Sequence, residues 1–430
     1  MMKKPFEDKK ILILGATSNE IPVVKRAQEL GAYVITTDYN KDYRLSPAKY
    51  VSDECWDISW SAIEELKQRC ILNNVNAVLA GYSEIRVASQ IKLCKELGLP
   101  CYVNEEQLEI TRDKILFKET CRHYGVPVIK EYKSIDEVDQ FPVIVKPTDR
   151  AGSIGVGIAY NRTELEAAYQ VAMDKSLSKR VIIEEYITDA MEMDAHYAVC
   201  DGKITLLTTD DIIAASDNIK DGKVVQSVWL YPSKYNEEFL KTVDKPLQDM
   251  IRGIGVQNGT IFFSGFVNNR GEFRFFECGF RLWGEQEFEY NFQKIGINYL
   301  DVYLHHAFYG NAHGIALNDN PNSKLKGVSL NLYVIGGTIS KLQGIQELAD
   351  NKDCFLSLVD SYVGQKCTFE NAILTKAGLV GFANEDPTQL KHDVDNAYES
   401  VVIEDENGNS MLYDKLDTCR ILRWWEKDGL

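Results

Sequence analysis

The sequence has 430 residues, 45% of them hydrophobic and 26% charged, which is typical of a globular protein with about two or three domains. Its net charge of −16 disfavours binding to nucleic acid and to anionic membranes, so a phosphate ligand needs a local positive pocket. No apolar run reaches the length of a membrane span, and the N-terminal residues lack a signal-peptide core. The ten cysteines show no CxxC or zinc-ligand spacing and the histidines no metal pattern, so we expect reduced thiols and a cytoplasmic protein.

The first block of the chain alternates short apolar strands with amphipathic helices. We expect strands at 11–14, 33–36 and 77–79, and helices at 21–30, 61–73 and 85–97. This alternation predicts a parallel sheet with helices on its faces. The first turn lacks the G-x-G-x-x-G fingerprint of dinucleotide-binding proteins, which disfavours a dehydrogenase, so Asp38 is interpreted as a strand-end residue.

The second block is richer in strands that are separated by tight turns. A helix is expected at 113–124 and another at 163–173, with Thr163 as a plausible N-cap. We expect strands at 181–187, 194–199, 203–209, 223–230, 260–267 and 272–278. Turns such as Asp201-Gly202 and Arg270-Gly271 predict antiparallel pairing between many of them.

The third block follows a polar, loop-like stretch at 310–324, the best candidate for a domain boundary. We expect strands at 329–335 and 367–374, a helix at 388–402 and a final hairpin at Glu406-Asn-Gly.

The segment 142–157 is the most informative part of the sequence. A short apolar strand, 143–145, leads to Lys146, and a turn containing Gly152, Ser153, Gly155 and Gly157 follows. Glycines allow backbone N–H groups to face an anion, and a lysine on a rigid strand adds a fixed positive charge. The segment therefore suits a polyphosphate, although an ordinary hairpin with a surface lysine would have the same pattern.

Three other features of the second block carry suitable chemistry, and each has a simpler structural explanation when taken alone. Lys114 is a helix-borne lysine of the kind that is usually solvated. The strand end 181–187, followed by Glu192, could bind a purine through its backbone and a ribose through the carboxylate. Glu277 and Arg281, with Gly279 between them, could hold magnesium and a phosphoryl oxygen, or form a structural ion pair.

In this order and spacing, the four features resemble the ATP-grasp superfamily, which includes biotin carboxylase, carbamoyl phosphate synthetase, D-alanine–D-alanine ligase and ligases of purine biosynthesis. The resemblance implies an α/β plus α+β chain with a Rossmann-like pre-ATP-grasp domain at 1–103 and an ATP-grasp domain of two α+β subdomains at 104–310. It also implies a small α+β, carboxylase-like C-terminal domain at 311–430, suggested by Gly336-Gly-Thr-Ile-Ser-Lys-Leu-Gln-Gly.

The resemblance also implies roles for individual residues. Lys114 and Lys146 would contact the phosphates of ATP under the 150–157 loop, and Glu192 would bind the ribose. Glu277 would bind Mg²⁺, and Arg281, with Lys146, would assist phosphoryl transfer. The residues implied to bind the nucleotide are Lys114, Lys146, Ser153, Ile154, Gly155, Glu184, Glu185, Tyr186, Ile187 and Glu192.

The metal-binding strand departs from the superfamily's pattern. That pattern reads Glu-x-Asn-x-Arg, whereas Gly279 replaces the Asn here. The acid or glutamine expected on the preceding strand aligns with Ser264 or Gly265, which leaves Glu277 as the one clear ligand. One magnesium ion is retained in this interpretation and a second is in doubt, because Mg²⁺ can complete its shell with water and phosphate oxygens.

The function implied is an ADP-forming ligase that joins a small-molecule carboxylate to an amine through an acyl phosphate. A nucleotide-binding protein without turnover and a carboxylating ligase of the biotin carboxylase or purine type remain as alternatives. The expected partners are small molecules rather than nucleic acid or membrane, and many members of the superfamily form homodimers.

Overall fold

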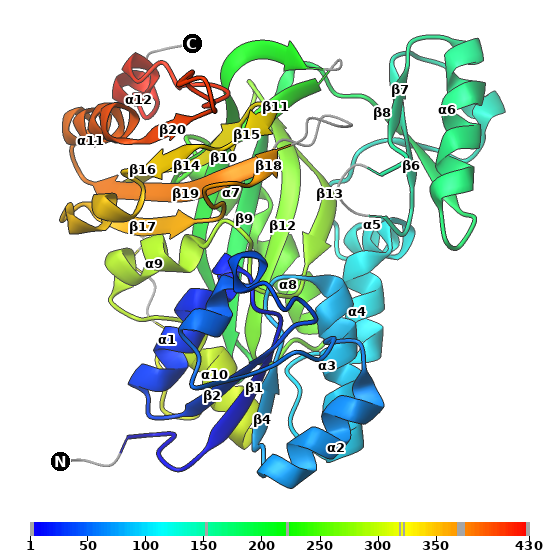
Figure 1. The fold of residues 1–430 in the computed structure, drawn as a ribbon. Coiled ribbons are helices and arrows are strands. Elements are labelled where there is room, and N and C mark those ends of the chain that lie inside the picture. Colours follow the sequence, from blue (N-terminus) through cyan, green and yellow to red (C-terminus); the bar gives the residue numbers. More distant parts are fainter. Residues whose placement is uncertain are drawn as a thin grey trace.

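The computed structural model describes residues 4–150, 154–220, 223–317, 320, 323–367 and 375–426, without the side chains of 216–220, 223 and 224. It confirms the expected combination of α/β and α+β architecture (Figure 1). A parallel sheet, a large antiparallel sheet and a small lobe are the main parts of the fold. In the described part of the chain, no helix is both long and apolar enough to cross a bilayer.

The N-terminal part is the predicted parallel sheet, with strands in the order β3-β2-β1-β4. Its strands are β1 (Lys10–Leu14), β2 (Tyr33–Thr37), β3 (Glu54–Trp56) and β4 (Ala77–Leu79), and its helices are α1 (Ile21–Glu29), α2 (Ile63–Asn73) and α3 (Glu84–Leu97). Strand β3 was not expected, because three residues are too few to show a period. Asp38 accepts hydrogen bonds from the Asn40 amide (2.9 Å) and the Ser46 hydroxyl (3.0 Å), in agreement with a strand-end role.

The small lobe comes next in the chain and stands to one side of the large sheet (Figure 1). Helices α4 (Glu105–Arg112) and α5 (Lys114–His123) lead to it, and its sheet has the order β5-β8-β6-β7. The lobe consists of β5 (Glu131–Tyr132), β6 (Val143–Pro147), β7 (Gly157–Ala159), α6 (Arg162–Lys175) and β8 (Val181–Glu185). The expected N-cap Thr163 is wrong, because the Asn161 side chain accepts the Glu164 amide (3.1 Å) and α6 begins one residue earlier.

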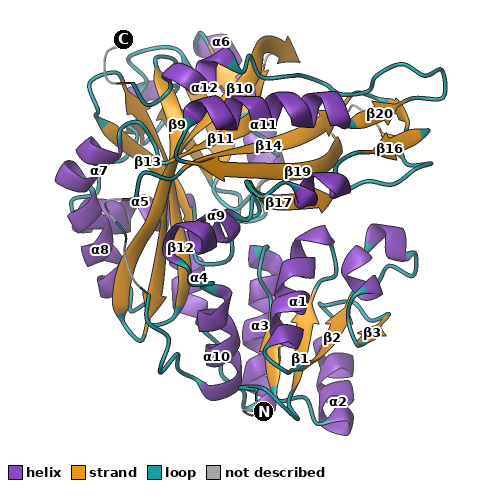
Figure 2. Ribbon diagram, turned by 90° about the vertical axis from the view of Figure 1, so that its left-hand side faces the viewer, coloured by secondary structure: helices purple, strands orange, loops and turns teal. Residues whose placement is uncertain are grey.

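The large sheet has the order β13-β12-β9-β10-β11-β14-β19-β17, and each pairing is antiparallel, as the turns predicted for the second block. Its strands are β9 (Ala190–Cys200), β10 (Lys203–Lys220), β11 (Lys223–Tyr231), β12 (Gly259–Asn268), β13 (Phe273–Gly279), β14 (Lys326–Val334), β17 (Cys354–Val359) and β19 (Thr375–Asn384). Figure 2 shows how strongly this sheet twists between β12 and β17.

The large sheet continues across the boundary predicted at 310–324. Strand β14 pairs with β11 on one side and with β19 on the other, so residues of the second and third blocks share one sheet. The division of the chain into domains stays a prediction. Part of the strand expected at 367–374 lies outside the described residues.

The remaining helices cover the large sheet and connect it to the N-terminal part. They are α7 (Asn236–Thr242), α8 (Asp244–Gly253), α9 (Glu287–Ile295), α10 (Leu300–Tyr309), α11 (Pro387–Ser400) and α12 (Cys419–Arg423). Short strands β15 (Gly337–Thr338), β16 (Lys341–Gln343), β18 (Lys366–Cys367) and β20 (Val402–Glu404) form two small ribbons. Arg26 of α1 binds Asp301 of α10 through two hydrogen bonds (2.7 and 2.8 Å), which ties the parallel sheet to the rest.

Replacing Leu330 by Ala tests the continuity of the large sheet. Leu330 is 1% exposed and lies between Val228 of β11 and Val380 of β19. The cavity that the substitution creates should lower the free energy of unfolding by about 2–5 kcal/mol. Denaturant unfolding measures the loss. Leu72→Ala is the control, because Leu72 is 79% exposed and its removal should change little. Equal effects of the two substitutions would contradict the continuous core.

Candidate active site

Glu184 is a buried carboxylate held between two lysines. It lies on the central strand β8 of the small lobe, and its Oε2 is 2.8 Å from the Nζ of Lys146 on β6. Lys118, from α5, contacts the other carboxylate oxygen. The side chains of Glu184 and Lys118 are 1% and 0% exposed, and that of Lys146 is 14% exposed. Two positive charges therefore surround one negative charge, which leaves a positive excess beside the more exposed lysine.

The pKa values agree with a charged triad. Burial raises the pKa of the Glu184 carboxyl, but the charges of Lys146 and Lys118 outweigh it and hold the pKa below its ordinary value. Burial also lowers the pKa of Lys118, and Glu184 opposes that shift.

The edge strand β13 of the large sheet borders the small lobe. The Phe275 amide donates to the Pro127 carbonyl (2.9 Å), and Arg274 pairs with Glu185 (3.0 Å). The ammonium of Lys146 lies 5.4 Å from the centre of the Phe276 ring, in a cation–π contact. The lysine of the predicted phosphate loop thus faces the strand that carries Glu277.

Lys114 and the glycine loop lie at one end of the lobe. The Nζ of Lys114 donates to the Arg150 carbonyl (2.9 Å), which brings this lysine to the start of the loop. Ile154 is exposed, and Ser153 lies outside the described residues. Gly155 has φ +75°, and a Cβ there would lie 2.8 Å from the Lys175 side chain. Packing and backbone conformation therefore favour glycine at this position, independently of its predicted role in a phosphate loop.

The predicted adenine hinge follows β8. The amide of Glu185 donates to the Lys130 carbonyl (3.0 Å), and that of Tyr186 to the Pro142 carbonyl (3.2 Å). A purine contact at Tyr186 would therefore have to use its carbonyl. Tyr186 and Ile187 are both half-buried at this position.

An acidic row crosses one face of the large sheet. Glu277 of β13 pairs with Ser264 of β12, Ser264 with Asp194 of β9, and Asp194 with Asp210 of β10. Glu192 shares this face because it is two residues from Asp194 on the same strand. Burial, followed by the charge of Glu277, raises the pKa of Glu192 to about 7. Lys146 opposes this shift, so the lobe's positive charge and the sheet's acidic face lie within electrostatic reach of each other.

The absence of an asparagine at position 279 has a steric cause. A Cβ on Gly279 would lie 2.4 Å from the Phe262 ring of the paired strand, so no larger residue fits while that ring is in place. The ring also lies 5.0 Å from the guanidinium of Arg281. Arg281 in turn binds Glu84 of α3 (2.5 Å), which places it between the large sheet and the N-terminal part.

The structure also contains charged residues that the sequence did not single out. Lys118 is one, and it gave no signal because its partner Glu184 is far away in the sequence. Asp194 and Asp210 are two more, and the alternation Glu192-x-Asp194-x-His196 could have revealed a polar strand face.

Comparisons with known proteins found sequence relatives that include a ligase and a formyltransferase. The family model "D-ala D-ala ligase C-terminus" matches residues 119–249. The D-alanine–D-alanine ligase of Fusobacterium nucleatum is 26% identical over 170 residues, which cover 39% of this chain and 55% of that protein. The formate-dependent phosphoribosylglycinamide formyltransferase of Bacillus subtilis is 24% identical over 279 residues, covering 60% of this chain and 68% of that protein. The match thus spans little more than half of the first relative.

Solved structures share the fold over nearly the whole chain. An L-amino acid ligase from Bacillus licheniformis has a TM-score of 0.74 at 16% identity and covers 93% of this chain and 100% of its own. The biotin carboxylase domain of Hydrogenobacter thermophilus 2-oxoglutarate carboxylase has a TM-score of 0.75 at 16% identity, covering 98% of this chain and 94% of its own. That structure is of a dimer in complex with MgADP, ADP and bicarbonate.

The Glu184 triad predicts a large and pH-dependent loss of stability in Glu184→Gln. The substitution leaves the buried charge of Lys118 unpaired by a carboxylate, which should cost about 3–5 kcal/mol near neutral pH. Because the folded-state pKa of Glu184 is lowered, its contribution is present above its ordinary value of 4.5 and is lost as the pH falls through the folded value. The difference between wild type and variant should therefore shrink below pH 4.5 in denaturant titrations.

Glu185→Gln is the matched control for this measurement. Glu185 is 38% exposed and its partner Arg274 is 40% exposed, so their pair should contribute less than about 1 kcal/mol. A loss at Glu185 as large as at Glu184 would contradict the buried triad.

Proposed function

This chain has the ATP-grasp fold, and we propose that it is an ATP-dependent, ADP-forming ligase that joins a carboxylate to an amine through an acyl phosphate. The observation that carries the proposal is the position of Lys146, which is paired with buried Glu184 and faces the strand of Glu277. The segment that matches the D-alanine–D-alanine ligase family, 119–249, contains this lysine, the predicted hinge and Glu192. The Fusobacterium relative and the two solved structures are named as ligases or carboxylases, whereas the Bacillus subtilis relative is named a formyltransferase.

The triphosphate of ATP would bind beside the small lobe. Lys146 could still attract a phosphate, because the single negative charge of Glu184 is shared with Lys118. Lys114 would reach the phosphates after exchanging its contact with the Arg150 carbonyl for a phosphate oxygen. Charge-assisted hydrogen bonds of this kind are stronger than those to a neutral carbonyl.

Magnesium would bind on the acidic face at Glu277. The raised pKa of Glu192, caused in part by Glu277, indicates carboxylates that repel each other and that a cation would relieve. Carboxylate oxygens suit Mg²⁺, which takes its other ligands from water and phosphate. When bound, the ion would neutralise phosphate charge. Ser264 and Gly279 are poor ligands, so we propose one such ion at this position.

The chemistry follows from positioning and charge rather than from a protein nucleophile. The substrate carboxylate attacks the γ-phosphate of ATP, which releases ADP, and the amine then displaces phosphate from the acyl phosphate. Lys146 stabilises the phosphoryl oxygens during transfer. Arg281 would hold the substrate carboxylate or the transferring group once it leaves Glu84. We also propose a cytoplasmic protein, and a homodimer on the precedent of the Hydrogenobacter domain.

Two alternatives are each favoured by one observation. Gly279, which cannot bind a metal, favours a protein that binds nucleotide without turnover. The match to a biotin carboxylase domain solved with bicarbonate favours a carboxylating ligase.

An assay of ADP release separates the three functions. The protein is incubated with ATP, Mg²⁺ and pools of carboxylates and amines, with and without bicarbonate. ADP release that needs both a carboxylate and an amine supports the proposal. Tight ATP binding without turnover across the panel would support the binding protein, and a strict need for bicarbonate would support the carboxylating ligase.

Lys146→Ala should weaken ATP binding about 30-fold, since a charge-assisted phosphate contact contributes about 2 kcal/mol. Calorimetry with MgATP measures the affinity, and a thermal melt checks that the variant is folded. Lys92→Ala, which removes an exposed lysine on α3, should bind ATP like the wild type. Unchanged affinity in a folded Lys146 variant would argue strongly against this nucleotide site.

Glu277→Gln should lower kcat by about 100-fold or more while leaving the fold intact, because the variant loses the charge that holds magnesium beside the phosphates. Glu272→Gln is the control, since Glu272 precedes the same strand and pairs with Arg270 at the surface. Steady-state kinetics of both variants test the assignment. Full activity in Glu277→Gln would reject the metal role.

A further inference from the structure

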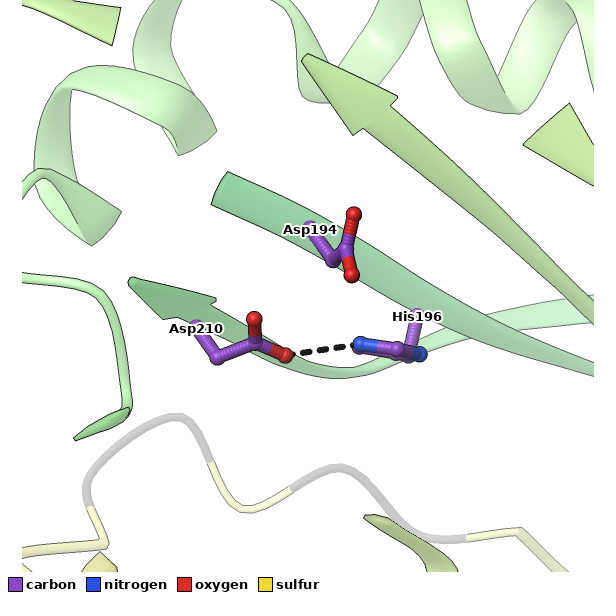
Figure 3. A group of neighbouring side chains, drawn as sticks. All are labelled: Asp194, His196 and Asp210. Carbon is purple, nitrogen blue, oxygen red and sulfur yellow. Dashed lines mark hydrogen bonds and ion pairs between the residues drawn. The ribbon is translucent and has the colours of Figure 1, made fainter. Parts of the chain in front are cut away.

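Asp194, His196 and Asp210, none of which was assigned to the nucleotide, form a compact buried cluster (Figure 3). Asp194 and His196 lie two residues apart on β9, and Asp210 is on the neighbouring strand β10. One possible ligand atom from each side chain lies within 4.8 Å of the others. The Nε2 of His196 is 2.7 Å from the Oδ2 of Asp210.

The carboxylates of this cluster lack the partners that buried charges need. Among the described residues, neither oxygen of Asp194 has a hydrogen-bond partner, and neither does Oδ1 of Asp210. Both side chains are 0% exposed. Burial, followed by the charge of Asp210, raises the pKa of Asp194, and the Ser264 hydroxyl, which lies outside hydrogen-bonding geometry, opposes only part of the shift. Buried carboxylates normally pair with cations or coordinate metals, so a bound cation would stabilise this cluster.

The surroundings of His196 suit a metal ligand. Its other ring nitrogen, Nδ1, lies 3.6 Å from Oε1 of Glu287, and the Tyr299 hydroxyl donates to that same carboxylate oxygen. A metal-bound histidine commonly directs its second N–H toward a carboxylate, which fixes the ring and its tautomer. Glu287 would therefore orient His196 so that Nε2 faces the two aspartates.

We propose that Asp194, His196 and Asp210 bind one divalent transition-metal ion, of the Mn²⁺ to Zn²⁺ series, at a site separate from the nucleotide's magnesium. Ligands about 2.0–2.2 Å from a tetrahedral ion lie about 3.3–3.6 Å apart. The three ligand atoms lie within 4.8 Å of one another, so the side chains need to close by no more than about 1–1.5 Å. An imidazole with two carboxylates suits these ions better than Mg²⁺ or Ca²⁺, which prefer oxygen alone. Binding displaces the proton of the His196–Asp210 hydrogen bond to solvent.

The burial and the register set this site apart from a substrate pocket and from Glu277. The three side chains are at most 1% exposed, which suits a bare ion rather than an organic amine. Ser264 of β12 stands between Asp194 and Glu277 in the sheet register, so the two sites use different strands. The proposed ion lies at the β9–β10 end of the acidic row, beyond Ser264 from Glu277, where it would fix β9 against β10 without taking part in phosphoryl transfer.

The test is Mn²⁺ binding to the full chain in the absence of nucleotide. Calorimetry measures the affinity and stoichiometry, and pulsed electron paramagnetic resonance identifies the ligands. The wild type should bind one Mn²⁺ with ¹⁴N coupling from one imidazole, and Zn²⁺ should displace it. Asp210→Asn and His196→Gln should each weaken binding about 100-fold or more. Glu272→Gln, which removes an exposed carboxylate paired with Arg270, is the matched control and should bind Mn²⁺ like the wild type.

The resonance spectrum is recorded on the wild type, so it tests the site even if a variant of one of the three ligands fails to fold. No binding, or bound Mn²⁺ without nitrogen coupling, would overturn the site. Loss of binding in Glu277→Gln would also overturn it, since that result would assign the ion to the nucleotide face. The assay contains no ATP, so its failure would leave the proposed ligase activity untouched.

Discussion

The arrangement of the small lobe depends on one buried carboxylate, Glu184, which is shared by two lysines. Buried charges are costly unless they are paired, so Glu184 constrains where Lys118 and Lys146 can lie. Lys118 comes from α5 and Lys146 from β6, and the ion pairs therefore fix the helix against the sheet. The same constraint directs the ammonium of Lys146 toward β13, where the rest of the proposed chemistry is found.

The charge distribution explains how an acidic protein could hold a polyphosphate. The net charge is −16, but the triad carries an excess of positive charge at the lobe, and the acids that face it are on the large sheet. A magnesium–triphosphate complex would join these two surfaces, since its phosphates suit the lysines and its metal suits Glu277. The proposed second ion would lie further along the same sheet, where Asp194 and Asp210 are buried.

The sequence predicted the local structure well where the pattern of side chains is periodic. The strands and helices of the parallel sheet were found within one or two residues, because apolar strands and amphipathic helices alternate there. Three-residue β3 was missed, and Thr163 was preferred to Asn161 as a cap although either residue type can cap a helix. The continuity of the large sheet could not be predicted, since pairing between β11 and β14 joins residues about a hundred positions apart in the sequence.

The sequence singled out Lys146 and Glu277, whose roles stay predictions, but not the residues that hold them in place. The Lys118–Glu184 pair depends on tertiary contact, as does the Phe262 ring that excludes a side chain at Gly279.

The central claim is that MgATP binds between the small lobe and β13. Hydrogen exchange with a non-hydrolysable ATP analogue and Mg²⁺ tests this claim most directly. The account predicts slower exchange in the segment from Lys146 to Gly157, at the end of β8, and in β13. Protection confined to the turn after β1, with none in these segments, would contradict it.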